Sequence, residues 1–586
     1  SASETPVIAA GTSQVIDVTI PAASLPFGTT GVYPVGVALS GGGSDVGTAR
    51  TAIAWNSAST TPVPIAIAAP LTVPTGTDTG ADATFISAST LATYTAPDGI
   101  LSRELDDLEN TQIAIGIDPR ILASIRILGK SAPQSAKDWL LRLESVSNDT
   151  FPLAWADADL TVALQSGEQA PPATPPLDYA INPALFAATA AAPTNGATPS
   201  PRPTSNPALP ALPTSASLVA FKYTLPKLSW PAEDSVTASD LTKLAASGTT
   251  AVILSSSNVS RSGSTAQPGA SAVIDKTTVA VSDSVLSDYL RAAVKSPTHA
   301  GWVAAMTKLV TSIDQIGLGS ATAPVMLATL DQNWLTTSDQ LPHTLAALGS
   351  QSWVDSTTLT KAMTSTQTTA KLVNKPESST RIARVRAMLD AETQEVGFSV
   401  VADKPQALTS SRRLNLLSLL SNEWSPNSAA WDKASAQFLT DSQKIVNSVQ
   451  VVDSSNVLFL SDQSALPVTV SNEFDQPVTV YIVVRPLSTQ LSVDPKYSRV
   501  KLTIEADAQH KAQIPLSSLS NGKAEVSVTL YSPSGKQVGA TKSIKINVQA
   551  GWETAGTVIF AVLVFALFGF GIFRNIRKRR KARASE

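Results

Sequence analysis

The stretch of sequence on which the fold prediction depends is Ile113-Ala114-Ile115-Gly116-Ile117-Asp118-Pro119-Arg120. A short run of small and apolar residues is typical of a strand buried on both faces. Asp-Pro is a favourable helix start, because aspartate caps the first turn and proline fits the first helical position. The same order of strand and helix recurs from residue 64 to residue 375. Strands that alternate with helices predict parallel βα units.

Seven short apolar stretches take part in this alternation, and amphipathic helical segments separate them. They are residues 65–68, 113–117, 151–155, 218–223, 251–254, 278–281 and 325–328. Seven parallel strands can form an open doubly wound sheet or a closed barrel. Neither a GxGxxG turn nor a phosphate-binding loop follows any strand, so nucleotide binding has little support. We favour a seven-stranded βα barrel over residues 61–375, interrupted by a flexible proline-rich insertion at 167–217.

The regions that flank the barrel have different periodicities. Residues 1–60 contain alternating segments at 15–20, 31–39 and 49–55, which predict a partial β-sandwich. Residues 376–452 have mainly helical periodicity. Residues 453–550 contain six or seven strand-like segments at regular spacing, which favours an immunoglobulin-like β-sandwich.

The C-terminus carries a long uncharged stretch, TAGTVIFAVLVFALFGFGIF, from Thr554 to Phe573. Twenty such residues cross a hydrocarbon core of about 30 Å. We predict a transmembrane helix at 551–573 and a basic cytoplasmic tail at 574–586, because short positive segments stay in the cytoplasm. A buried core helix is the alternative. The bulk of the chain would then be extracytoplasmic, and we expect either a removed signal peptide or a start inside a longer precursor.

The composition argues against several classes of site. The chain has no cysteine and a formal net charge of −3, so disulfides, thiolate metal sites and a domain-sized nucleic-acid-binding face are not predicted. Its three histidines, His299, His343 and His510, lack metal-ligand spacing. No G-x-S-x-G elbow is present. We therefore expect no metal, no cofactor and no catalytic residue of these kinds.

Candidate ligand-binding residues follow the predicted strands, at the end of a βα barrel where ligands bind. They combine carboxylates and an amide with tryptophans: Asp118, Trp155, Asp157, Trp230, Glu233, Asp234, Asp283, Asp331, Asn333 and Trp334. Carboxylates accept sugar hydroxyls or act as acid and base, and indole faces stack on sugar rings. The plain alternative is helix capping, because Asp and Asn are common N-caps after strands.

Several segments together are similar to a known family. They are Ile115–Leu122, the Trp139 helix followed by Pro152–Asp159, Leu466–Asn472 with Pro477–Val480, and Phe27–Pro34. The chain resembles an uncharacterised family of actinobacterial, single-pass, extracytoplasmic membrane proteins, often encoded beside a MurJ-type lipid II flippase. The resemblance implies a role around peptidoglycan or cell-wall assembly and a barrel similar to glycoside hydrolase and polysaccharide deacetylase barrels. It supplies no catalytic residues, and the absence of an H-x₃-H pair argues against metal-dependent deacetylation.

These observations predict a protein anchored in the cell membrane with its bulk in the cell envelope. We expect the barrel mouth to bind a cell-wall glycan or precursor such as lipid II, or a partner in the wall or flippase machinery, without catalysis. A carboxylate-dependent glycan hydrolase and a structural scaffold without a ligand are the two alternatives.

Overall fold

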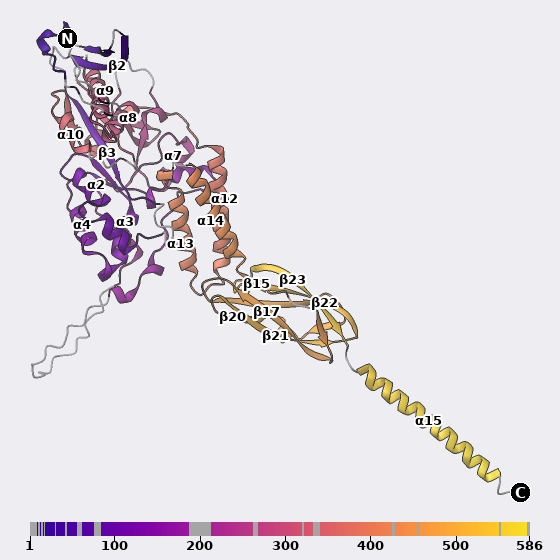
Figure 1. Cartoon of the computed structure of the whole chain (residues 1–586). Coiled ribbons are helices and arrows are strands. Elements are labelled where there is room, and N and C mark those ends of the chain that lie inside the picture. The colour runs from indigo at the N-terminus through magenta and orange to yellow at the C-terminus, as the bar shows by residue number, and fades with distance from the viewer. Residues whose placement is uncertain are drawn as a thin grey trace, which may run out of the picture. The chain divides into compact units, whose positions relative to one another are not determined.

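The computed structural model describes residues 9–582 with gaps at 10–11, 13–15, 17, 30, 42–43, 56–60, 76–83, 187–211, 262–267, 319–321, 332–333, 335–339, 425–427, 454–455 and 550–551. Figure 1 shows the chain and labels many of its elements. It divides into two compact units. The first unit comprises Ser1–Ala173, Asn182–Ile382 and Leu420–Asn427, and the second comprises Thr174–Ile181, Ala383–Leu419 and Ser428–Glu586.

The first unit begins with a β-hairpin. Strands β1 (Gly31–Gly41) and β2 (Ser44–Trp55) pair antiparallel, with Gly31 opposite Trp55. A 3₁₀ turn, η1 (Ala22–Ser24), precedes them. The described residues between 16 and 20 do not form the predicted strand. One hairpin, and not two packed sheets, is therefore what the described part of residues 1–60 contains.

A parallel sheet forms the centre of the first unit. Its strand order is β11-β3-β4-β5, and β12 also pairs with β3. The strands are β3 (Val63–Leu71), β4 (Ala114–Ile117), β5 (Thr150–Pro152), β11 (Met326–Thr329) and β12 (Val354–Thr357). All their pairings are parallel.

A second, mixed sheet has the strand order β13-β9-β10-β7-β6. Strands β6 (Leu228–Ser229), β7 (Ala251–Ser255) and β10 (Thr277–Ser282) are parallel neighbours. Strand β9 (Ser271–Ile274) runs antiparallel to β10, and β13 (Thr368–Thr369) pairs with β9. A separate short ladder joins β8 (Val259–Ser260) to β14 (Lys371–Leu372).

The predicted seven-stranded βα barrel is wrong, because these two sheets do not join into one closed ladder. Strand β10 already pairs with β7 on one edge and β9 on the other, so β11 finds no free edge there. On the opposite side, β5 has three residues and ends in Pro152, and β6 has two. Proline donates no ladder hydrogen bond. Single hydrogen bonds at strand ends link the two sheets, such as the Asp283 N–H after β10 to the Leu327 carbonyl of β11 at 2.8 Å.

The fourth predicted strand, at 218–223, is also wrong. Residues Ser215–Val219 form helix α6. The helix begins with a capping box, in which Thr214 and Ser217 each accept the other's backbone N–H. Two hydroxyl side chains that satisfy the first backbone N–H groups favour a helix over an extended chain. The strand that takes this place in the sheet is β6, nine residues after α6.

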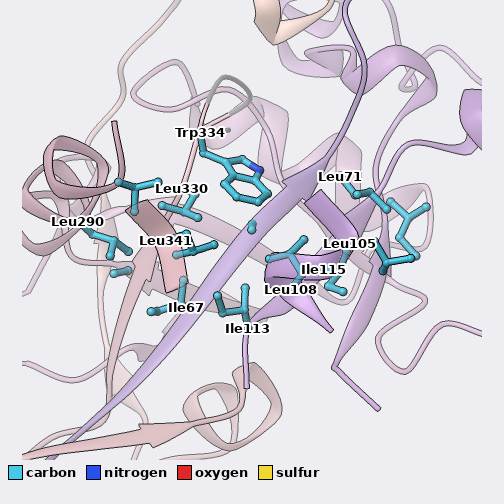
Figure 2. Close-up of a cluster of buried hydrophobic side chains, with 14 of the residues drawn as sticks. Ile67, Leu71, Leu105, Leu108, Ile113, Ile115, Leu290, Leu330, Trp334 and Leu341 are labelled. Carbon is cyan, nitrogen blue, oxygen red and sulfur yellow. The ribbon is translucent and has the colours of Figure 1, made fainter. Parts of the chain in front are cut away.

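The alternation of side chains along β3 separates two cores. Ile67 and Leu71 belong to a large cluster with Leu105 and Leu108 of α2 (Ile100–Leu108), and Figure 2 shows these side chains and Trp334, which belongs to the same cluster. Ala66 and Ala68, which point to the opposite face, join a cluster of mostly small residues from both sheets. Gly116 also lies here, where an added Cβ would come within 2.8 Å of Phe151.

Helices of the first unit cover the sheets and connect their strands. Besides α2 and α6 they are α1 (Ala88–Tyr94), α3 (Pro119–Ile127), α4 (Gln134–Glu144), α5 (Leu160–Gln165), α7 (Ala238–Ala246), α8 (Ser284–Val294), α9 (His299–Gly317), α10 (Gln340–Gly349) and α11 (Leu359–Met363).

The second unit combines a helical section with a β-sandwich. Helices α12 (Ser379–Ser399), α13 (Pro405–Leu419) and α14 (Ser428–Val446) run side by side (Figure 1). Arg412 of α13 donates to Glu395 of α12 at 2.8 Å and to the Phe438 carbonyl of α14 at 3.0 Å. Phe398 and Leu408 extend into the sandwich core, so the helices and the sandwich share buried surface.

The sandwich consists of two packed sheets with the strand orders β15-β17-β21-β19 and β16-β23-β22-β18-β20. The strands are β15 (Val449–Val451), β16 (Val457–Phe459), β17 (Gln463–Asn472), β18 (Val478–Pro486), β19 (Leu491–Val493), β20 (Val500–Ile504), β21 (Ala508–Ser518), β22 (Gly522–Tyr531) and β23 (Gln537–Val548). Buried residues such as Val468, Val480 and Val526 alternate with partly exposed ones, as expected for strands with one face in a core.

Helix α15 (Trp552–Ala582) follows the sandwich. Within the described residues it is the one helix long and apolar enough to cross a membrane, over Gly556–Arg580. No part of its most apolar stretch is buried inside the protein. The alternative of a buried core helix therefore has no support.

Candidate functional site

The Asp118 carboxylate joins two loops of the first sheet. It caps helix α3, where one of its oxygens accepts the Arg120 N–H at 2.8 Å and the Ala156 N–H at 2.9 Å. Its other oxygen lies 3.6 Å from the Arg120 guanidinium, and both side chains are buried. Burial raises the pKa of Asp118, and the charge of Arg120 opposes this rise. The carboxylate thus holds the loop after β4 against the loop after β5.

The loop after β5 has an unusual backbone. Ala156 and Asp157 have φ values of 56° and 51°, which side chains other than glycine rarely adopt. Trp155 is buried and meets Phe85 edge to face at 5.7 Å, and its indole N–H has no acceptor among the described residues. The Asp157 carboxylate accepts the Asn422 side-chain amide at 3.3 Å. Trp155 and Asp157 therefore lie inside the protein and not at an open mouth.

A segment from the end of α13, Leu420–Trp424, covers this part of the first unit. Asp159 donates its N–H to the Leu420 carbonyl at 2.8 Å, and Ala158 forms a β-bridge with Ser421. Glu423 accepts the Thr75 N–H at 2.6 Å, beyond the end of β3. We call Leu420–Trp424 the cover segment. It occupies the space beside Asp157 where the sequence predicts a ligand.

The carboxylates near β6 and β11 face cations. Arg291 of α8 donates to Glu233 at 2.7 Å and to the Thr329 carbonyl at 2.9 Å. Lys295, one helical turn further on, lies 2.6 Å from Asp331. Both carboxylates therefore have a cationic partner within the protein.

Asp234 is held in the same way on the neighbouring loop. Its carboxylate lies 3.3 Å from the Lys375 ammonium, and it accepts the Ser257 hydroxyl. Its φ of 59° places the backbone in the left-handed region, which aspartate tolerates better than most residues.

The remaining predicted residues have structural positions or lie outside the described residues. Asp283 caps α8 and accepts the N–H groups of Val285 and Leu286, both at 3.0 Å. Trp334 belongs to the core of Figure 2, where its indole donates to the Pro70 carbonyl at 2.9 Å. Asn333 is not among the described residues.

Trp230 differs from the other predicted residues, because it lines a pocket. The ring is half-buried, 5.9 Å from Phe151, and borders a cavity of about 430 Å³ where β5 and β6 fail to pair. We call this cavity the seam pocket. Its walls come from the ends of β5, α5, β6 and α7, and its lining is Pro152, Leu153, Ala154, Ala158, Leu160, Thr161, Pro226, Lys227, Leu228, Ser229, Trp230, Pro231, Leu244, Ser247, Gly248 and Thr249.

The seam pocket offers hydroxyl groups, one indole and one cationic side chain. Ser229, Ser247 and Thr249 supply hydroxyl groups, whereas the buried Thr161 hydroxyl donates to Asp159. Lys227 is the one charged residue in the lining. No carboxylate takes part in it. Across the described residues, no group of three or more His, Cys, Asp or Glu side chains is arranged to hold a metal ion.

The sequence analysis did not predict the cover segment. It also did not predict the three cations that face candidate carboxylates, which are Arg291, Lys295 and Lys375. The signal for Arg291 and Lys295 was available, because residues four apart on a helix share a face. No local signal links Glu423 or Asn422 to the first sheet, since about 265 residues separate Asn422 from Asp157.

Several solved structures match a small part of this chain. They include native alpha-2-macroglobulin of Escherichia coli (20% identity, 18% of this chain and 7% of that chain, TM-score 0.15). Another is WR4, an MSP family member of C. elegans (12% identity, 17% of this chain and 98% of that chain, TM-score 0.14). A third is the ASH/PapD-like domain of human CEP192 (12% identity, 18% of this chain and 85% of that chain, TM-score 0.14). The match thus spans a small fraction of the length of the macroglobulin.

No curated protein sequence matches the chain. A protein family described as a family of unknown function, DUF6049, matches residues 1–584. This match covers nearly the whole sequence, so the chain belongs to the DUF6049 family.

Proposed function

We propose that this protein is a non-catalytic, membrane-anchored protein of the cell envelope that binds a cell-wall glycan in the seam pocket. The observation that carries the proposal is the half-buried Trp230 in the wall of a cavity of about 430 Å³ lined by hydroxyl groups. An indole face stacks on the apolar face of a sugar ring, and hydroxyl groups exchange hydrogen bonds with the ring substituents. The volume lies within the range of small-molecule sites.

The absence of a carboxylate from the pocket lining favours binding over hydrolysis. A glycoside hydrolase of the usual kind places two carboxylates on either side of the scissile bond. The carboxylates that the sequence predicts as candidates cap helices or face cations instead, as Asp118 and Glu233 illustrate. We therefore keep hydrolysis as the second candidate function, and the experiment described below distinguishes it from binding.

The location in the envelope rests on α15 and on the basic residues that follow its apolar stretch. Seven cations lie between Arg574 and Arg583. The positive-inside rule keeps this end in the cytoplasm, which puts the two folded units outside. The resemblance to actinobacterial proteins encoded beside a lipid II flippase suggests peptidoglycan or its lipid-linked precursor as the ligand.

The test is retention of the full-length protein, reconstituted in nanodiscs, on purified peptidoglycan and on lipid II. Trp230→Ala is compared with Trp302→Ala, a matched control because Trp302 is also half-buried but does not line the seam pocket. Binding by wild type and the control, reduced for Trp230→Ala, supports the proposal. Retention of none of the three would leave the scaffold alternative, and release of soluble sugars would favour the hydrolase.

A further inference from the structure

Three exposed leucines lie on loops at one end of the β-sandwich. Leu460, Leu487 and Leu519 are 67%, 60% and 63% exposed, although leucine is usually buried. Leu460 follows β16, Leu487 follows β18 and Leu519 follows β21. We call these three residues the leucine tip.

Backbone hydrogen bonds hold the three loops together. The Leu519 N–H donates to the Gln490 carbonyl at 2.8 Å, which joins the loop after β21 to the loop after β18. The Ser518 N–H donates to the Asp462 carbonyl at 2.8 Å, which joins it to the loop after β16. The leucine tip is therefore one surface and not three unrelated side chains.

The chain leaves the sandwich for α15 at this same end. Phe459, the residue before Leu460, pairs with Val548, the last residue of β23, and Gly522 at the start of β22 pairs with Val548 from the other side. Only residues 549–551 separate β23 from α15. Three extended residues span at most about 10 Å, and the four helical steps from Trp552 to Gly556 add about 6 Å of helix rise.

This short connection limits how far the sandwich can stand from a membrane that α15 crosses. The polar layer on each side of the hydrocarbon core is itself several ångströms thick. The end of the sandwich that carries Leu519 therefore lies at or close to the lipid headgroups, whichever way the helix tilts.

The charges on the loops differ between the two ends of the sandwich. The loops at 460–462, 487–490 and 519–521 hold one charged residue in ten, Asp462. The loops of the opposite end, at 473–477, 505–507 and 532–536, hold five in thirteen, which are Glu473, Asp475, Glu505, Asp507 and Lys536. Serine, threonine, glutamine and asparagine surround the leucines instead, so little charge has to be desolvated when this end meets lipid.

We infer that the leucine tip inserts into the interface of the lipid bilayer and seats the sandwich on the membrane. Apolar side chains favour the boundary between headgroups and acyl chains, and several in one rigid surface act together. The membrane contact would fix the orientation of the sandwich relative to the bilayer, in addition to the anchoring by α15. This inference rests on the proposed membrane anchoring by α15.

Single-cysteine labelling tests the insertion, because the chain holds no cysteine of its own. Leu460→Cys, Leu487→Cys and Leu519→Cys are made one at a time in the full chain, labelled with a polarity-sensitive fluorophore (NBD) and reconstituted in phosphatidylcholine/phosphatidylglycerol vesicles. Gln509→Cys is the matched control, because Gln509 is exposed at the opposite end, opposite Ser471 of β17. Val562→Cys reports whether α15 itself is in the membrane.

We expect a blue-shifted emission and weaker quenching by aqueous iodide at the three tip positions, and a water-like signal at Gln509→Cys. A water-like signal at all three tip positions, together with a lipid signal at Val562→Cys, would overturn the inference and leave the anchor intact. A water-like signal at Val562→Cys would show instead that the anchoring itself is wrong, and the inference would fall with it. Unchanged thermal unfolding of each labelled variant verifies that the exposed substitutions leave the fold intact.

Discussion

Asp118 accepts the backbone N–H of Ala156 at 2.9 Å, and this bond ties the helix cap after β4 to the strained loop after β5. The same carboxylate oxygen accepts the Arg120 N–H, and Arg120 in turn donates to the Val73 carbonyl beyond β3 at 2.9 Å. One buried carboxylate thereby fixes the ends of three neighbouring strands. We assign Asp118 a structural role at the place where the sequence indicates a ligand.

Replacement of Asp118 is expected to destabilise the first unit. Asp118→Ala removes a helix cap and leaves the buried Arg120 guanidinium without its counter-charge, for a loss of about 2–4 kcal/mol. Asp118→Asn keeps an oxygen that can accept the N–H groups of Arg120 and Ala156. Its loss of stability should therefore be less than half of the loss for Asp118→Ala. Chemical denaturation followed by circular dichroism measures the difference. A wild-type midpoint for Asp118→Ala would contradict the structural role.

Glu104 of α2 predicts a pH dependence of stability. Its side chain is buried, and burial raises its pKa well above the usual value, with Arg103 opposing the rise. Since the folded-state pKa is the higher one, this residue's contribution to stability is fully present below the unfolded pKa of about 4.3. It is lost as the pH rises through the folded pKa, because the carboxylate must then ionise in a buried site.

Glu104→Gln removes this ionisation. The melting temperature of the variant minus that of wild type should therefore be smallest near pH 4 and increase toward neutral pH. Thermal unfolding at several pH values measures it. A difference that stays constant over this range would mean that Glu104 does not titrate in the folded protein.

The attraction between the charges of Glu233 and Arg291 should contribute little to the stability of the first unit. Both side chains are partly exposed, at 35% and 16%, so a double-mutant cycle with Glu233→Gln and Arg291→Met is expected to give a coupling below about 1 kcal/mol. Arg291→Lys should still destabilise, because one ammonium cannot reproduce the forked contacts with Glu233 and Thr329. A Lys variant as stable as wild type would refute this geometry.

Gly116 tests the close packing of β4 against the side chains of β5, its neighbour in the same sheet. An added Cβ would lie 2.8 Å from Phe151 and 2.9 Å from Leu153, both buried, so Gly116→Ala should cost about 1–3 kcal/mol. Gly349→Ala is the matched control, because no heavy atom lies within 4 Å of its added Cβ. Equal unfolding midpoints for the two variants would be inconsistent with the packing described.

Local patterns in the sequence predicted many elements of the first unit. Residues 65–68, 113–117, 251–254 and 278–281 fall in or beside β3, β4, β7 and β10, and Asp118 caps α3 as its Asp-Pro sequence indicates. Apolar runs and capping residues act over a few positions, so they can be recognised without knowledge of the fold.

The predictions that proved wrong depend on interactions between segments that are distant in the sequence. Strand β9 takes the edge of β10 that barrel closure would need, and nothing in residues 271–274 indicates which edge they will pair with. The cover segment reaches the first sheet from a point some 350 residues along the chain from Thr75. Of the ten candidate residues, Trp230 alone lines the seam pocket, because the others satisfy caps, ion pairs or the core or lie outside the described residues.

The central claim is that the seam pocket binds a cell-wall glycan through Trp230. Its most direct test is the equilibrium affinity of the full-length protein in nanodiscs for soluble peptidoglycan fragments, measured by titration calorimetry for wild type, Trp230→Ala and Trp302→Ala. We predict binding at least about tenfold weaker for Trp230→Ala, a loss of about 1.4 kcal/mol, and wild-type affinity for Trp302→Ala. Equal affinity of wild type and Trp230→Ala, or no measurable binding by the wild type, would contradict the claim.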